Sequence, residues 1–107
     1  MEICKEGIEE VKKAIVSHTS YDYLELHRKL YLMDNYGKKY RSGTYKGKTY
    51  YYPREHFVDE LEELMESLYS GWFQEVSGVD PNHLLDILDK IHEEWKAEYD
   101  RKMKEGG

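Results

Sequence analysis

The sequence predicts a mainly α-helical protein with a small β-hairpin (α+β). Its four helices form a compact bundle in the order helix, helix, hairpin, helix, helix. Apolar residues recur at helical spacing in four stretches that are separated by turn-forming residues. Between the second and third stretches, residues 38–52 are rich in tyrosine, threonine and glycine, a composition that favours two short strands. The 107 residues suffice for a single domain, and the hairpin is expected to pack on one side of the bundle or to project from it.

The first two helices are expected over residues 5–16 and 21–35. In the first, Ile8, Val11 and Ile15 share one face, which Cys4 extends by a turn. The stretch 18–20 (His-Thr-Ser) interrupts this pattern and supplies an N-cap for the second helix. The apolar face of the second helix comprises Tyr23, Leu26, Leu30 and Met33, and Gly37 ends it in the left-handed conformation.

The hairpin is expected to turn at Lys46-Gly47, a two-residue loop that places Tyr45 opposite Lys48. Gly43 marks a β-bulge or a second turn. Because successive side chains on a strand point to opposite faces, Tyr51 is expected to pack inward on the helices. Its neighbours Tyr50 and Tyr52 are then the more exposed rings.

The last two helices are expected over residues 54–70 and 81–103, joined by a connector at residues 72–79. Pro53 precedes the third helix and Gly71 ends it, while Asp80-Pro81 is a strong start signal for the fourth. The third helix has the cleanest amphipathic pattern in the chain, with acidic residues on its polar face. The residues expected to be most buried in the shared core are Leu30, Leu61, Leu64, Leu68, Leu88 and Ile91.

Composition favours a cytoplasmic protein. No apolar run approaches the length of a membrane span, and the first residues lack the pattern of a signal peptide. The single cysteine, Cys4, cannot form a disulfide within the chain and is expected to pack as a small hydrophobe. The formal net charge of −6 disfavours a general attraction to nucleic acid or to anionic lipid.

The sequence carries no motif typical of a catalytic or metal site. None of the five histidines lies three to five residues from another, and there is no cysteine pair, so no metal ion and no cofactor is expected. The serines lack the context of an activated nucleophile. The carboxylates between Asp59 and Glu66 lie on a polar helix face, where they are expected to be solvated rather than catalytic. These observations predict that the protein is not an enzyme, unless a site is assembled only in space.

One segment stands out by its charge. Residues 38–56 hold six basic residues and one acidic residue, a net charge of +5, whereas the rest of the chain holds ten basic and 21 acidic residues. The same segment holds five of the eleven tyrosines, and basic side chains interleaved with aromatic rings are typical of a binding surface for phosphates and bases. The predicted binding residues are Tyr40, Arg41, Lys46, Lys48, Tyr50, Tyr52 and Arg54. Two structural explanations compete: lysines on an edge strand deter aggregation, and the hairpin could complement the acidic third helix in the same chain or in a second copy.

The preferred hypothesis is a small non-enzymatic regulator that binds a protein partner. The chain is similar in type to the small, acidic, tyrosine-rich bacteriophage proteins that inhibit host machinery, which implies an inhibitory role. The alternative is a nucleotide-binding or nucleic-acid-binding module that uses the basic hairpin. A variant of the first hypothesis places the contact on the acidic face of the third helix instead.

Overall fold

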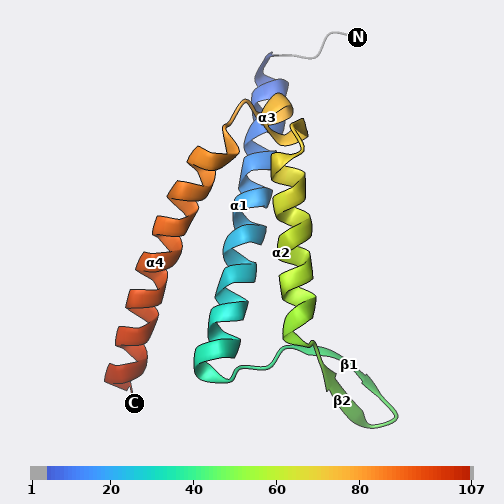
Figure 1. Ribbon diagram of the computed structural model, residues 1–107, viewed down its shortest axis with the longest axis vertical. Helices are drawn as coiled ribbons and strands as arrows, with labels where there is room; N and C mark the ends of the chain where they lie inside the picture. The colour runs from blue at the N-terminus through green and yellow to red at the C-terminus, as the bar shows by residue number, and fades with distance from the viewer. Residues whose placement is uncertain (1–4, 107) are drawn as a thin grey trace.

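The computed structural model describes residues 5–106, and of residues 5–8 only the backbone, so the expectation for Cys4 lies outside the described residues. The elements follow one another along the chain as α1 (Lys5–Tyr36), β1 (Arg41–Tyr45), β2 (Lys48–Tyr51), α2 (Arg54–Tyr69), α3 (Trp72–Ser77) and α4 (Pro81–Gly106) (Figure 1). This arrangement confirms a mainly helical fold with four helices and one antiparallel hairpin.

The two helices expected before the hairpin form one continuous helix, α1, of 32 residues. The break expected at residues 18–20 does not occur, and Thr19 and Ser20 are half-buried inside the helix. Ile15 and Val16 on one side of this stretch, and Tyr23 on the other, pack against the same hydrophobic cluster. This shared packing outweighs the weak helix preference of threonine and serine, which is only a few tenths of a kcal/mol per residue, roughly.

Local signals at the hairpin are confirmed. Gly37 ends α1 with a φ of 65°, and the strands turn at Lys46 and Gly47, whose φ angles of 50° and 77° are typical of a type I′ turn. Tyr45 pairs with Lys48, and the register shifts between Arg41 and Gly43, where the bulge was expected.

The connector expected at residues 72–79 contains an additional short helix, α3, of six residues. Phe73 anchors it, because its side chain is almost completely buried in the core cluster. The buried Ser77 hydroxyl donates to the Phe73 carbonyl (2.6 Å) and accepts from the Val79 amide (3.1 Å). The start signal for α4 is confirmed, since the Asp80 carboxylate accepts the amide N–H of Asn82 at 3.0 Å.

The core consists of two clusters, both of which use α1. The upper cluster contains Tyr23, Leu68, Phe73, Leu84, Leu85 and Leu88. The lower cluster, nearer the hairpin, contains Leu26, Leu30 and Phe57. Of the expected core residues, Leu30, Leu68 and Leu88 are buried, whereas Leu61 and Leu64 are only half-buried.

The expectation for Ile91 was wrong, because this side chain is 39% exposed. The buried positions of α4 are Pro81, Leu84, Leu85, Leu88 and His92. The apolar pattern of the sequence had placed Ile91 on the inner face of α4. In the structure the helix is turned by about one residue, so that His92 occupies this inner position instead.

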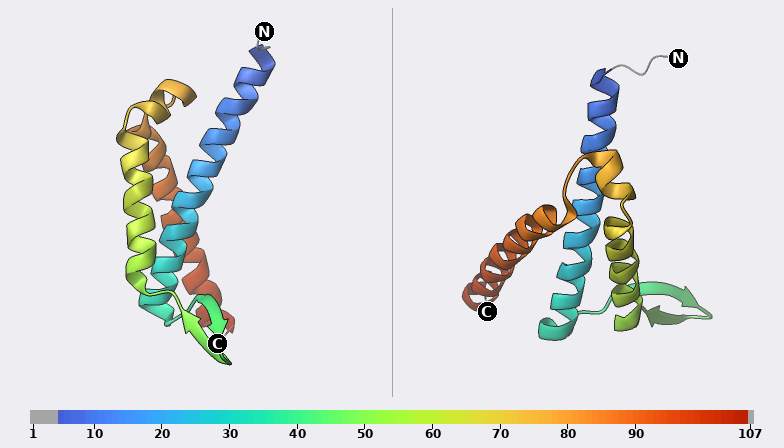
Figure 2. Two further views of the ribbon diagram at one scale, coloured as in Figure 1. Left: turned by 90° about the vertical axis from the view of Figure 1, so that its right-hand side faces the viewer. Right: turned by 45° about the horizontal axis from the view of Figure 1, so that its top comes forward.

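The molecule is elongated rather than compact. Its radius of gyration is 17.5 Å, compared with about 13 Å for a compact domain of this length. Helix α1 lies between α2 and α4, and α4 diverges from α1 toward its C-terminal end (Figures 1 and 2). Within residues 5–106, no helix combines the length and the apolar character needed to cross a membrane.

The rotated face of α4 predicts a contrast between two substitutions on the same helix. Leu88→Ala should lower the free energy of unfolding by roughly 2–5 kcal/mol, because Leu88 is 3% exposed and its loss leaves a cavity. Ile91→Ala should cost about 1 kcal/mol or less, as is typical of surface positions. Urea unfolding followed by circular dichroism measures both values, and equal losses would contradict the observed orientation of α4.

Candidate functional site

The hairpin forms an arm that projects from the helices near the end of α1 and the beginning of α2 (Figures 1 and 2). We call residues 41–51 the hairpin arm. Every residue of β1 and β2 is exposed, so neither face of the two-stranded sheet is covered by a helix. An isolated two-stranded hairpin is marginally stable in water, and the contacts at its base therefore hold it in place.

Two of the predicted binding residues, Tyr40 and Tyr52, anchor the arm instead of lying on its free surface. The Tyr52 amide donates to the Tyr40 carbonyl at 2.9 Å. Both rings meet the buried ring of Phe57 edge-on, each with 5.6 Å between ring centroids. Tyr52 also stacks on His56 with 4.3 Å between ring centroids.

Arg54 belongs to the same anchor. Its guanidinium donates to both carboxylate oxygens of Asp34 near the end of α1, at 2.9 and 3.2 Å. This hydrogen-bonded pair raises the pKa of Arg54, although both side chains remain in contact with solvent. The contact ties the beginning of α2 to the end of α1, so Arg54 is already engaged within the chain.

The expectation that Tyr51 packs inward was wrong. Tyr51 is 50% exposed and Tyr50 is 45% exposed, whereas Tyr52 is half-buried. All residues of both strands are exposed, because the helices contact only the base of the arm. Beyond the base there is no inner face for Tyr51 to occupy.

The positive charge of the arm lies beside its aromatic rings. The ammonium groups of Lys46, Lys48 and Lys39 lie 5.4–5.6 Å from the ring centroids of Tyr45, Tyr50 and Tyr51, within the range of cation–π attraction. Among residues 5–106, neither these lysines nor Arg41 forms an ion pair with a carboxylate. Four predicted residues, Arg41, Lys46, Lys48 and Tyr50, thus lie on the free arm, together with Tyr45 and Tyr51, which the prediction did not include. Lys39, also absent from the prediction, directly precedes the arm and is exposed.

A second cluster, which sequence reasoning missed, fills the space between α1 and α4. The rings of His27 and His92 lie 5.4 Å apart by their centroids, although these residues are 65 positions apart in the sequence. His92 stacks on Trp95 (5.7 Å), and the Arg28 guanidinium lies over the same indole (5.2 Å). The sequence carries no clear signal for this pair, because the apolar pattern of α4 indicated Ile91 rather than His92 for the inner face, and only the fold brings the two histidines together.

Hydrogen bonds from tyrosine hydroxyls to aspartates border this aromatic layer. Tyr23 donates to Asp89, and both Tyr31 and Tyr36 donate to Asp100. The bonds from the two hydroxyls lower the pKa of Asp100. The two bonds to Asp100 join the C-terminal half of α4 to the end of α1 through polar contacts rather than through aliphatic packing.

Burial lowers the pKa of both imidazoles in this layer. For His27 the nearby Asp89 opposes the effect, whereas Lys96 adds to it. For His92 the neighbouring His27, Lys96 and Arg28 add to the effect of burial, and Glu93 opposes it. The Nδ1 atom of His92 is buried without a hydrogen-bond partner, so this imidazole is poorly placed to carry a charge.

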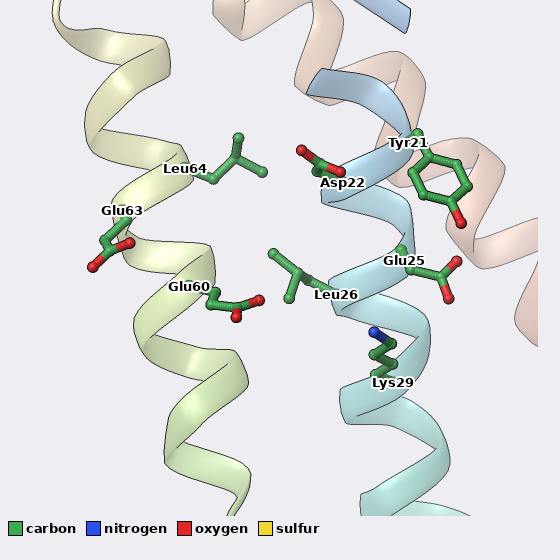
Figure 3. A pocket seen from close by; sticks show the side chains of 8 residues that line it. All are labelled: Tyr21, Asp22, Glu25, Leu26, Lys29, Glu60, Glu63 and Leu64. Carbon is green, nitrogen blue, oxygen red and sulfur yellow. The ribbon is translucent and has the colours of Figure 1, made fainter. Parts of the chain in front are cut away.

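A groove of about 500 Å³ lies between the middle of α1 and the middle of α2 (Figure 3). Leu26 and Leu64 face each other across it, and charged side chains surround them. Its full lining is Tyr21, Asp22, Glu25, Leu26, Lys29, Glu60, Glu63 and Leu64.

Within residues 5–106, no three histidine, cysteine or acidic side chains are grouped so that they could hold a metal ion. Comparisons of the chain with protein-family models, with curated proteins and with solved structures gave no match. The arm, the aromatic layer and the groove are therefore interpreted from their own geometry and charge.

The anchoring of the arm predicts different effects for two adjacent tyrosines. Tyr52→Ala should increase hydrogen exchange of the β1 and β2 amides, because it removes the ring that packs on His56 and Phe57. Tyr51→Ala should leave exchange nearly unchanged, since its ring is exposed. Amide exchange measured by NMR tests this contrast, and a larger effect of Tyr51→Ala would contradict the anchor.

The histidine pair predicts that stability falls in weak acid. Because both pKa values are lowered in the folded state, the unfolded chain binds more protons below its ordinary histidine pKa of about 6.5. The free energy of unfolding should therefore decrease as the pH falls through and below this value, before carboxylates titrate. Urea unfolding at a series of pH values measures the slope.

The matched variants for this measurement are His27→Phe with His92→Phe, which should flatten the pH dependence in this range, and His83→Phe, which should not. His83 is exposed on the same helix as His92. A wild-type slope that survives the double substitution would show that other groups cause the acid sensitivity.

Proposed function

We propose that this protein is a non-enzymatic binding protein that contacts an acidic surface of a protein partner through its hairpin arm. The single observation that carries the proposal is the exposed arm, whose lysines and Arg41 have no carboxylate partner among the described residues. A projecting, anchored ribbon of this kind presents both of its faces to a partner.

The chemistry of the arm supports a protein partner. Tyrosine is enriched at protein–protein interfaces, because its ring supplies contact area while its hydroxyl accommodates residual water. Tyr45, Tyr50 and Tyr51 offer three exposed rings, and the lysines beside them would steer an acidic partner toward the arm. Outside residues 38–56 the chain is strongly acidic, which disfavours extended contact with a nucleic-acid backbone.

Binding of a nucleotide or nucleic acid is the second candidate. It is favoured by the lack of any acidic residue between Asn35 and Arg54, together with exposed rings that could stack on bases. In this case the phosphates would contact the same lysines that the first candidate assigns to carboxylates.

The first candidate would regulate its partner by occupying a surface of that partner. A small protein without catalytic groups acts on its partner by covering a surface that the partner uses for something else. Inhibition of host machinery by a phage-type protein would be one form of this role, and the bound surface of the partner would decide whether the effect is inhibitory.

Charge reversal on the arm tests the proposal. Lys46→Glu with Lys48→Glu should weaken partner binding by at least about tenfold, because attraction is replaced by like-charge repulsion. The matched control is Lys13→Glu with Lys90→Glu, two exposed lysines on helices that give the same change in net charge. Titration of the captured partner by surface plasmon resonance at several salt concentrations measures the affinity and its salt dependence.

Nuclease treatment distinguishes the two candidates. Affinity capture from a lysate with and without nuclease should give the same protein partner if the first candidate is right. Loss of the captured material after nuclease treatment would favour the second candidate. Equal binding by the Lys46→Glu, Lys48→Glu protein and by the Lys13→Glu, Lys90→Glu control would exclude the arm as the contact surface in both candidates.

A further inference from the structure

The groove between α1 and α2 has a charge opposite to that of the arm. Two of its carboxylates come from α1 and two from α2, and Lys29 is its only lysine or arginine. The Lys29 ammonium lies over the rings of Tyr40 and Phe57, at 5.6 and 5.3 Å from their centroids. Because Lys29 forms no ion pair, the acidic lining of the groove is left largely uncompensated within the described residues.

The carboxylates differ in how they are engaged. Glu60 pairs with His56 at 2.8 Å, whereas Asp22, Glu25 and Glu63 have no ion-pair partner in the described part of the chain. In the close view, Asp22 points toward Leu64 and Glu60 points toward Leu26, so that charge borders the apolar strip from both helices (Figure 3). Glu25 and Glu63 point away from the gap in this view, so one carboxylate from each helix lies directly beside the apolar strip and two more lie at its outer rim (Figure 3).

This combination suits a side chain with an apolar stem and a positively charged end. Lysine and arginine bury their methylene groups along apolar surfaces while the charged group reaches a polar rim. The volume of about 500 Å³ lies within the range of sites that hold small ligands, and it accommodates more than one such side chain. In Figure 3, α4 lies behind α1, so the groove is on the side of the α1–α2 pair turned away from α4.

The hairpin arm presents the matching side chains, but it cannot place them in the groove of its own chain. Its base is fixed by Tyr40, Tyr52 and Phe57, and the arm projects away from the helix pair (Figures 1 and 2). A second copy of the chain has no such restriction. Its arm offers Lys46 and Lys48 with Tyr45 and Tyr50 on an exposed ribbon.

From this complementarity we infer that two copies of the protein associate, with the hairpin arm of each copy seated in the α1–α2 groove of the other. A reciprocal exchange closes on itself as a two-fold dimer and forms the arm–groove contact twice. The inference rests on the same exposed charges as the proposed function, but it does not depend on an external partner. Self-association would cover the arm and would therefore compete with partner binding.

Substitutions that reverse the charge of the arm or of the groove test the inference on purified protein. At low salt, sedimentation velocity over a wide concentration range should show a monomer–dimer equilibrium that shifts toward monomer at high salt. Lys46→Glu with Lys48→Glu (arm variant) and Asp22→Lys with Glu63→Lys (groove variant) should each weaken dimerisation by at least about tenfold. All four positions are exposed, so the substitutions leave the core intact.

Mixing the two variants gives the sharpest result. In a mixed dimer, the unchanged arm of the groove variant meets the unchanged groove of the arm variant, and the acidic arm meets the basic groove. Both contacts are complementary again, so an equimolar mixture should regain the dimer that neither variant forms alone. The matched controls, Lys13→Glu with Lys90→Glu and Asp86→Lys with Glu94→Lys, change exposed charges elsewhere and should leave the equilibrium unchanged.

Three outcomes would overturn the inference: a monomer at all concentrations, a dimer that neither variant weakens, or a mixture that stays monomeric. A monomer whose groove variant alone loses a captured partner would assign the groove to a basic segment of another protein. The proposed function is judged separately, because it fails if the arm variant retains full partner binding or if nuclease treatment removes the captured material, whatever the oligomeric state of the protein.

Discussion

The continuous helix α1 is the constraint on which the rest of the structure depends. One of its faces carries Leu26 and Leu30 against α2, and another carries His27 and Tyr31 against α4. Tyr23 lies in the upper cluster and also donates to Asp89 on α4, so it joins both contacts. Helices α2 and α4 lie on different sides of α1, and both pack against it (Figure 1). A break near residue 18 would divide the upper cluster, because Ile15 and Val16 pack against it from one side of that position and Tyr23 from the other.

The elongated shape follows from the length of α1, whereas the kind of side chain between α1 and α4 accounts for the divergence of these two helices. Near the connector, leucines and Phe73 bring the helices together by aliphatic and aromatic burial. Farther along α4, His92, Trp95 and Tyr99 stack in sequence, and their ring systems require more space than leucine. The polar atoms of such rings need partners, which Asp89 and Asp100 supply for three tyrosines. The same layer leaves His92 Nδ1 without a partner, so the aromatic packing carries a pH-dependent weakness that an aliphatic core would not have.

Features fixed by neighbouring residues were predictable from the sequence, and features fixed by distant contacts were not. The turn at Lys46-Gly47 and the helix start at Asp80-Pro81 depend on local backbone preferences, and both were predicted. The end of α1 at Gly37 is a third such feature. The continuity of α1 through Thr19 depends instead on packing that includes α3 and α4, which the local preference for a break does not reveal. For the same reason, periodicity alone could not decide whether the helix face with Ile91 or the adjacent face with His92 points inward on α4. Likewise, the sequence predicted that Tyr51 packs on the helices, but the helices reach only the base of the arm.

The separation of charge is also a consequence of this geometry. Pairing between the basic segment and acidic helix α2 in one chain would require the arm to fold back along the helices. The packing of Tyr40 and Tyr52 on Phe57 instead directs it outward, and Arg54 satisfies Asp34 at its base. The fold thereby holds two exposed surfaces of opposite sign that cannot neutralise each other within one molecule. Their charge is screened by small ions in dilute solution, and releasing those ions on contact with a complementary surface favours association. An intermolecular contact is therefore the means by which this fold can neutralise its own charge pattern.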